Sequence, residues 1–154
     1  MIIFLDIDGV LHADRAAIED GFCCRYILWE ILRKREFLRV VISSDWRKHH
    51  SLGEITEFIL KDGGEELRDR FLGVTPVLPG SSFEYCGREK ECLIWLEDNN
   101  HKETKWLAID DIAGNFKYGS DYLFLVNYKT GLIKEDVQVI LNKIDYMKVQ
   151  AILL

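Results

Sequence analysis

The chain has 154 residues, 48% hydrophobic and 30% charged, which is typical of one soluble globular domain spanning 1–154. Its formal net charge of −6 argues against a broad, sequence-independent grip on nucleic acid, which requires clustered lysine and arginine. The apolar N-terminal run is interrupted at Asp6 and is too short to span a membrane, so we expect a cytoplasmic protein with no membrane partner.

Cysteine usage indicates a reducing compartment. The chain contains no CxxC pair, and we interpret its cysteines as free thiols: Cys23, Cys24, Cys86 and Cys92.

Short apolar runs alternate along the chain with segments of helical periodicity. In chain order we predict a strand at 2–5, a helix at 26–37, a strand at 37–42, helices at 52–60 and 89–97, buried strands at 106–109 and 122–126, and an amphipathic helix through 137–144. Apolar strands separated by helices predict a three-layer α/β/α, Rossmann-like domain with a mainly parallel central sheet. Ligands of such sheets bind beyond the carboxyl ends of the strands.

Polar pairs follow three of the predicted strands. They are Asp6 with Asp8, Ser43 with Ser44, and Asp110 with Asp111. If all lie at one sheet edge, four carboxylates meet there, and they cannot all ionise together without a cation. Oxygen-rich sites suit Mg²⁺.

Two cations open the helix that precedes the third motif strand. Arg88 and Lys90 lie at the start of this helix, and a helix N-terminus itself favours a phosphate. Either side chain would complete an anion site beside the cation.

The segments DIDGV, VVISSDW, GREK and LAIDD resemble, in order, the four motifs of the haloacid dehalogenase (HAD) superfamily. The resemblance spans residues 2–111. The segments SSDWR, GREKECLIWL and WLAIDD, with a later GL, are also similar to the phosphatase-like HAD domain of Swiss Army Knife RNA repair proteins. The resemblance implies a HAD-like fold and the chemistry of a phosphatase.

The superfamily pattern implies a role for each residue of the first motif. Asp6 would be the nucleophile that forms an aspartyl-phosphate. Asp8 would protonate the leaving oxygen and then activate water, which requires it to be protonated part of the time, as a crowded carboxylate site favours. Gly9 would let the chain turn sharply beside the phosphate.

The metal and phosphate ligands follow from the same resemblance. Mg²⁺ would bridge Asp6, the backbone carbonyl of Asp8 and the acidic pair, with the direct ligand among Asp110 and Asp111 left open. Ser44 is preferred over Ser43 as a phosphate ligand, because the serine or threonine of the family often lies two residues before a tryptophan, as Ser44 does before Trp46. Arg88 and its rival Lys90 remain alternatives for holding the phosphoryl group.

The lengths between motifs leave little room for a cap domain. Residues 10–25 hold only a loop or flap, and residues 47–87 hold two short helices and a TPVLP turn. We therefore expect an open site that suits a phosphorylated small molecule or a nucleic-acid end, or a site that a partner closes.

These expectations favour a Mg²⁺-dependent phosphomonoester hydrolase acting on nucleotide or nucleic-acid-end phosphates. The alternative is a catalytically weak phosphate- or nucleic-acid-binding module of a repair assembly. A dehalogenase would leave the acidic pair idle, and a receiver domain would have no reason for Asp8.

Several other side chains have two interpretations. Trp46 either stacks on a base or packs its loop, and Arg47 either meets a backbone phosphate or belongs to that loop. His12 either touches substrate or is a loop histidine. We expect His49 and His50 to be exposed and three tryptophans to lie in the core: Trp29, Trp95 and Trp106.

Overall fold

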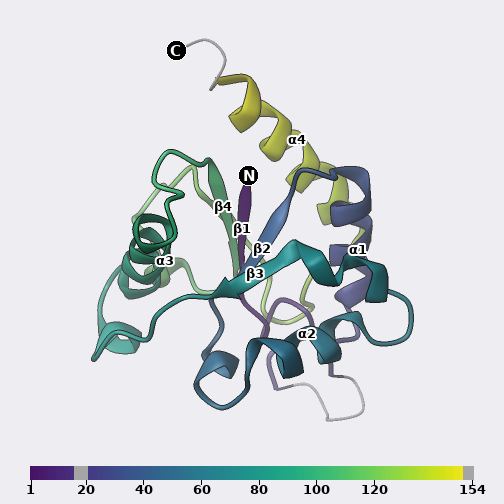
Figure 1. The fold of residues 1–154 in the computed structure, drawn as a ribbon, viewed down its shortest axis with the longest axis horizontal. Helices are drawn as coiled ribbons and strands as arrows, with labels where there is room; N and C mark the ends of the chain where they lie inside the picture. The colour runs from purple at the N-terminus through teal and green to yellow at the C-terminus, as the bar shows by residue number, and fades with distance from the viewer. Residues whose placement is uncertain (16–20, 151–154) are drawn as a thin grey trace.

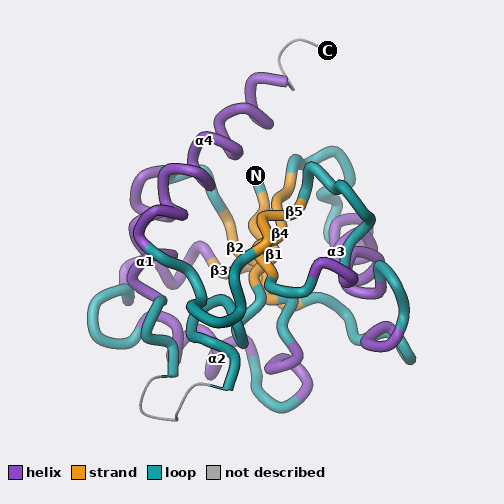
Figure 2. The backbone as a smooth tube through the Cα atoms, turned by 180° about the vertical axis from the view of Figure 1, so that it is seen from behind, coloured by secondary structure: helices purple, strands orange, loops and turns teal. Residues whose placement is uncertain are grey.

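The computed structural model describes residues 1–15 and 21–150. Its strands are β1 (Ile2–Leu5), β2 (Arg39–Ile42), β3 (Phe71–Val74), β4 (Trp106–Asp110) and β5 (Leu123–Leu125). They form a parallel sheet of order β3-β2-β1-β4-β5 (Figures 1 and 2). The helices are α1 (Arg25–Lys34), α2 (Leu52–Leu60), α3 (Gly87–Asp98) and α4 (Lys134–Gln150).

Helices cover both faces of the sheet, as Figures 1 and 2 show. Successive side chains of a strand point to opposite faces, so an apolar strand such as β1 supplies two cores. Ile3 and Leu5 pack in a cluster with α1, α2 and α4, whereas Ile2 and Phe4 pack in a second cluster with α3. The predicted three-layer α/β/α fold with a parallel sheet is confirmed.

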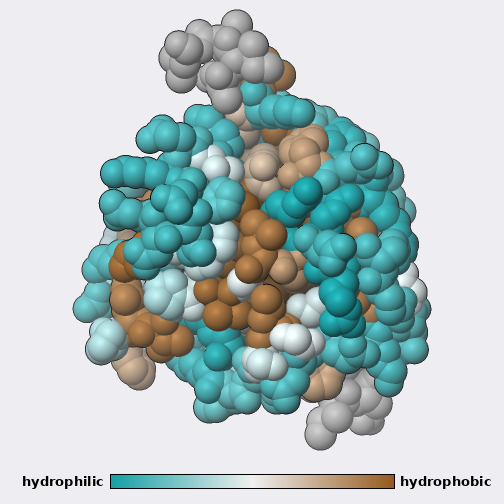
Figure 3. Space-filling model, viewed as in Figure 1, coloured by the Kyte–Doolittle hydropathy of each residue, from teal (hydrophilic) through white to brown (hydrophobic). Residues whose placement is uncertain are grey.

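Strand β3 was missed in the sequence, where only helices and a turn were predicted between residues 47 and 87. It is a short edge strand that contains Gly73, and only Phe71 of it is buried. Leu72 is 42% exposed and Val77, just beyond the strand, 49%. Figure 3 shows apolar side chains gathered near the middle of this face, where β3 crosses Figure 1.

Strand β5 is shorter and less buried than predicted. It covers Leu123–Leu125 instead of 122–126, and Leu125 is 52% exposed. The reason is its place at the other edge of the sheet, where one side of the strand has no neighbour.

The helices lie close to their predicted positions. α2 has the predicted bounds and begins at a capping box in which Ser51 and Glu54 satisfy each other's backbone N–H groups. The apolar stripe of α4 is buried as predicted, and Trp29, Trp95 and Trp106 lie in the core. The four cysteines are free thiols, as expected.

No cap domain interrupts the described part of the chain between β1 and α1. Its residues 9–15 and 21–24 form turns with an isolated bridge between Asp8 and His12, and residues 16–20 of the predicted loop at 10–25 lie outside the described residues. Among the described helices, none combines the length and apolarity that crossing a bilayer requires.

Candidate functional site

The first, second and fourth strands end at the same level of the sheet. The backbone N–H of Asp6 donates to the carbonyl of Ile109 at 3.0 Å, and that of Ser43 donates to the carbonyl of Leu5 at 2.9 Å. This parallel register places the residues that follow β1 and β2 beside those that end β4. The strand-end motifs therefore meet at one edge, as predicted.

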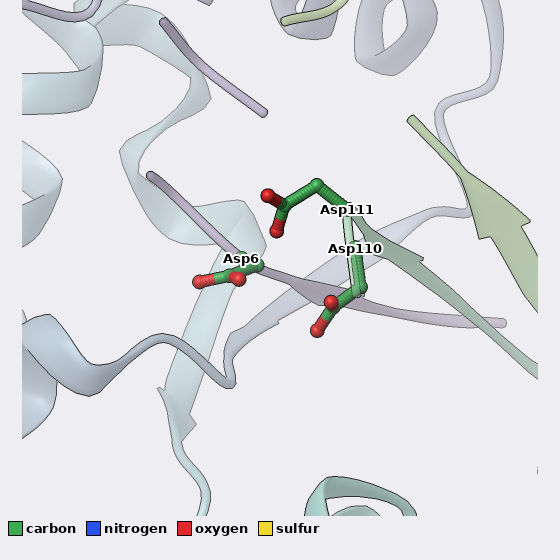
Figure 4. Close-up of side chains that lie close together, drawn as sticks. All are labelled: Asp6, Asp110 and Asp111. Atoms are coloured by element: carbon green, nitrogen blue, oxygen red, sulfur yellow. The ribbon is translucent and has the colours of Figure 1, made fainter. Parts of the chain in front are cut away.

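Three carboxylates cluster at this edge (Figure 4). Asp6, Asp110 and Asp111 each offer an oxygen atom, and these atoms lie within 4.8 Å of one another. Asp6 is 7% exposed and Asp110 is fully buried. Burial, and then the charge of Asp110, raises the pKa of Asp6, and burial also raises the pKa of Asp110 and Asp111. Buried carboxylates this close fit a divalent cation with oxygen ligands.

Gly9 packs closely against Asp111, one of the three clustered carboxylates. Its φ is +71°, and a Cβ atom there would lie 2.2 Å from Oδ2 of Asp111. A side chain at this position would therefore displace Asp111 from the cluster and would strain the backbone. The positive φ agrees with the sharp turn expected of Gly9, and its close neighbour among the site residues is Asp111.

A cavity of about 500 Å³ opens next to the cluster. The predicted residues that line it are Asp6, Asp8, Ser44, Arg88 and Asp111. Among these lining residues, Arg88 has a side chain that is only 11% exposed. The cavity thus brings a carboxylate nucleophile candidate, a hydroxyl and a guanidinium together.

The paired candidates for phosphate binding lie in different places. Ser44 lines the cavity and also accepts the backbone N–H of Trp46 at 3.4 Å, so it is both an N-cap and a cavity residue. Ser43 is buried beneath it, and its hydroxyl has no partner among the described residues. Lys90 lies outside the cavity lining and pairs with Glu84 at 2.8 Å.

Asp8 lies outside the close group of three carboxylates and makes side-chain hydrogen bonds of its own. Nε2 of His12 lies 3.2 Å from Oδ1 of Asp8, and Nε1 of Trp46 lies 3.1 Å from each carboxylate oxygen. The His12 bond, helped by Trp46 and opposed by burial, lowers the pKa of Asp8. This corrects the expectation that crowding favours the protonated form of Asp8, because two donors outweigh the desolvation.

His12 lies close to the first motif. His12 is buried, at 8% exposed, and the carboxylate of Asp8 raises its pKa. Its place is beside the first motif, where it pairs with Asp8.

The aromatic loop after β2 is packed rather than free. Trp46 contacts the rings of Phe22, His50 and Phe58, with centroids 5.1 to 6.0 Å apart. His50 is therefore partly buried against Trp46, contrary to the expectation, while His49 is exposed. Another cavity, of about 210 Å³, lies here and shares Asp8 and Asp45 with the first.

Arg47 does not reach solvent. Its side chain is 1% exposed and pairs with the buried carboxylate of Glu91 at 2.6 Å. The hypothesis that Arg47 contacts a phosphate of a nucleic-acid backbone is therefore wrong, because its guanidinium is buried and paired with Glu91.

Some cavity residues were not singled out in the sequence. They are Asp14, Asp45 and Tyr128, with Ile112 and Ala113 after the acidic pair. Asp45 lies within the second motif, VVISSDW, and Ile112 directly follows the fourth, so positions in or beside the motifs were the available signal. Asp14 and Tyr128 meet through a hydrogen bond from the Asp14 N–H to the Tyr128 carbonyl, a long-range contact without a local sequence signal.

A comparison with models of protein families gives a match. The model of the family described as "HAD domain in Swiss Army Knife RNA repair proteins" matches residues 2–137. Searches of the curated proteins and of the solved structures returned no match. The family match covers all of the strand-end motifs described above. The chain belongs to the family of HAD domains found in Swiss Army Knife RNA repair proteins.

Proposed function

We propose that this domain is a Mg²⁺-dependent phosphomonoester phosphatase that acts through an aspartyl-phosphate on Asp6. The observation that carries the proposal is the placement of Asp6 in one cavity with Ser44 and Arg88, next to Asp110 and Asp111. Nucleophile, phosphate ligands and cation ligands are the parts that such a reaction requires.

The metal ligands would be Asp6, the backbone carbonyl of Asp8 and the acidic pair. The raised pKa values of Asp6 and Asp110 support this assignment, because their buried charges lack a sufficient counter-charge within the protein. When bound, Mg²⁺ supplies positive charge that lets a carboxylate approach a phosphoryl group.

Each of the side chains in the cavity would have its own role in the reaction. An oxygen of Asp6 attacks phosphorus, and the bond to the leaving oxygen breaks as Asp8 gives that oxygen a proton. Asp8 next takes a proton from the water that attacks phosphorus, which releases inorganic phosphate and frees Asp6. Ser44 and Arg88 hold the phosphoryl oxygens throughout and stabilise their developing charge.

We further propose that the substrate is a nucleotide or the phosphorylated end of a nucleic acid. The support is the family's description, which names RNA repair, and the lack of a cap among the described residues. A site without a lid accepts a phosphate that projects from a large substrate.

Phosphate release with and without Mg²⁺ tests the proposal. The panel contains an aryl phosphate, mononucleotides, and oligonucleotides with 5′- or 3′-phosphates. We expect Mg²⁺-dependent release by the native protein, loss of release in Asp6→Asn, and native rates in the matched control Asp121→Asn, which changes an exposed aspartate. Equal activity of the native protein and Asp6→Asn would refute the assignment of Asp6 as the nucleophile.

A phosphate- or nucleic-acid-binding module with weak turnover is the second candidate. One observation favours it: His12 and Trp46 stabilise the ionised form of Asp8, which is the wrong form to protonate a leaving group. Under this candidate, phosphorylated oligonucleotides bind with Mg²⁺ but no member of the panel releases phosphate.

A further inference from the structure

Glu91 is a buried carboxylate that the reaction described above does not use. It lies on α3 one turn after Arg88 and is 1% exposed. Its Oε2 accepts from Arg47 Nη2 at 2.6 Å and from Arg88 Nη1 at 3.4 Å, and its Oε1 lies 3.1 Å from the N–H of Leu78 and 2.6 Å from the hydroxyl of Ser81. A buried charge persists only with such compensation. This carboxylate therefore links α3 to the loop that carries Arg47 and to the segment that contains Leu78 and Ser81.

The bond to Arg47 extends this tie to the serine loop. Arg47 donates to four backbone carbonyls at 2.7 to 3.2 Å, those of Ser43, Ser44, Thr75 and Pro76. Glu91, at 2.6 Å, is the nearer of the two acidic partners that hold this guanidinium, the other being Asp45 at 3.4 Å. The loop that carries Ser44 is thereby connected to the helix that carries Arg88.

Asp45 closes the arrangement on the cavity side. Its Oδ1 lies 2.9 Å from Arg88 Nη2 and 3.4 Å from Arg47 Nη1. The four side chains form a ring in which acids and arginines alternate, with Asp45 facing the cavity and Glu91 buried behind it. Without Glu91, the guanidinium groups of Arg47 and Arg88 would lose the carboxylate that lies between them, and Arg88 would keep its ion pair with Asp45 and its attraction to Asp6.

We propose that Glu91 is a positioning residue for phosphate binding. It holds the guanidinium of Arg88 and, through Arg47, the loop of Ser44 in the geometry that receives a phosphoryl group. Preorganised donors of this kind bind anionic oxygens without reorganisation during the reaction. This inference rests on the phosphatase function proposed for the site.

The contact between α3 and the loop before it does not depend on Glu91 alone. Gly87 approaches Ser81 so closely that a Cβ atom would lie 1.9 Å from the Ser81 carbonyl oxygen. The start of α3 is therefore seated by backbone packing as well. We accordingly expect Glu91→Gln, which keeps the size of the side chain, to fold.

Kinetics of Glu91→Gln with an aryl phosphate and Mg²⁺ provide the first test. Loss of a charged partner should raise KM about tenfold or more. The matched control Glu84→Gln removes an exposed carboxylate from a surface pair with Lys90 and should retain the native KM. A purely structural role would reduce the amount of folded protein, and so the apparent kcat, without changing KM; that result would overturn the proposal.

A milder variant keeps the test decisive if Glu91→Gln fails to fold. Ser81→Ala removes one donor from Oε1 of Glu91 and leaves every charge in place. We expect its KM to rise by about twofold to fivefold, less than that of Glu91→Gln. A native KM in Ser81→Ala, with Glu91→Gln unfolded, would also overturn the positioning role.

Nuclear magnetic resonance of the arginine side chains separates failure of this inference from failure of the phosphatase proposal. The guanidinium of Arg88, assigned by its absence in Arg88→Lys, should give resolved Nη signals in the native protein because its rotation is restricted. In Glu91→Gln these signals should average, while the control Glu84→Gln keeps them resolved. Unchanged Arg88 signals in Glu91→Gln would refute the inference whether or not the native protein releases phosphate.

Discussion

The indole Nε1 of Trp46 lies 3.1 Å from both carboxylate oxygens of Asp8, a residue 38 positions earlier in the chain. This bond joins the loop after β2 to the proposed acid/base, so the aromatic residue of the second motif acts on the first. The contact makes Trp46 part of the site without requiring it to touch a substrate.

Trp46→Phe removes this donor and keeps an aromatic ring against Phe22 and Phe58. We expect the pKa of Asp8 to rise, because a hydrogen bond to its ionised form is lost, and kcat to fall about threefold to tenfold as the carboxylate loses its fixed orientation. In the pH profile of kcat, the limb set by Asp8 should move to higher pH. Phe58→Leu changes the same aromatic cluster without touching Asp8 and should leave the profile in place. Identical profiles for Trp46→Phe and native protein would show that the indole does not act on Asp8.

The two cations at the start of α3 should differ sharply. Arg88→Gln should raise KM by about tenfold to a hundredfold, because it removes a nearly buried guanidinium from the cavity wall. Lys90→Gln should change KM by less than about twofold, because it breaks only an exposed ion pair. Steady-state kinetics below the unfolding temperature of each variant measure both. A larger effect from Lys90→Gln would reverse the assignment.

Two glycines allow the role of Gly9 to be isolated. Gly9 has φ +71° and a would-be Cβ 2.2 Å from Asp111, whereas Gly119 has φ +69° and no atom within 4 Å. Alanine at either position should lower the free energy of unfolding by about 1–2 kcal/mol through backbone strain. Only Gly9→Ala should also weaken Mg²⁺ binding, because only there must Asp111 move. Urea unfolding and Mg²⁺ titration check this, and equally weak Mg²⁺ binding in both variants would count against the clash.

The stability of the metal-free protein should fall as pH rises. Burial, and then the charge of Asp110, raises the pKa of Asp6 in the folded state. The unfolded chain therefore releases this proton first, at about pH 4, and the folded state binds more protons from there until Asp6 itself ionises. The stabilising contribution is complete below about pH 4 and is lost as pH rises through the raised pKa.

Thermal unfolding with a chelator and with Mg²⁺, as a function of pH, measures this effect. We expect Tm without metal to decline across this range and the increase in Tm on adding Mg²⁺ to grow with pH, since the metal binds the ionised carboxylates. In Asp6→Asn, the decline of the metal-free Tm with pH should be smaller. A metal-free Tm that rises over the same range in the native protein and not in Asp6→Asn would contradict the assignment of Asp6 as a destabilising buried charge.

The central part of the fold could be predicted because its strands are apolar on both faces. Strand β1 and strand β4 lie side by side in the middle of the sheet, and their burial leaves a continuous apolar run in the sequence. The edge strands β3 and β5 are half exposed, so their sequences carry a weaker signal. One was missed and the other was predicted too long.

The site, too, was predictable where the signal lies in the local sequence, and it was missed where a contact joins distant residues. The grouping of Asp6 with Asp110 and Asp111 was predictable, because parallel strands bring their carboxyl ends to one edge. The pairing of Arg47 with Glu91 joins residues 44 positions apart, so the sequence could not distinguish an exposed arginine from a buried one. The hydrogen bond from Trp46 to Asp8 spans 38 positions and was missed for the same reason.

Borohydride trapping of the phosphorylated protein tests the central claim most directly. An aryl phosphate and Mg²⁺ are mixed with the native protein, the reaction is stopped, and borohydride reduces any acyl phosphate to an alcohol. We predict that peptide mass spectrometry finds homoserine at position 6 and unmodified aspartate at position 8, with no reduction in Asp6→Asn. Phosphate release by the native protein without reduction at Asp6 would contradict the aspartyl-phosphate mechanism.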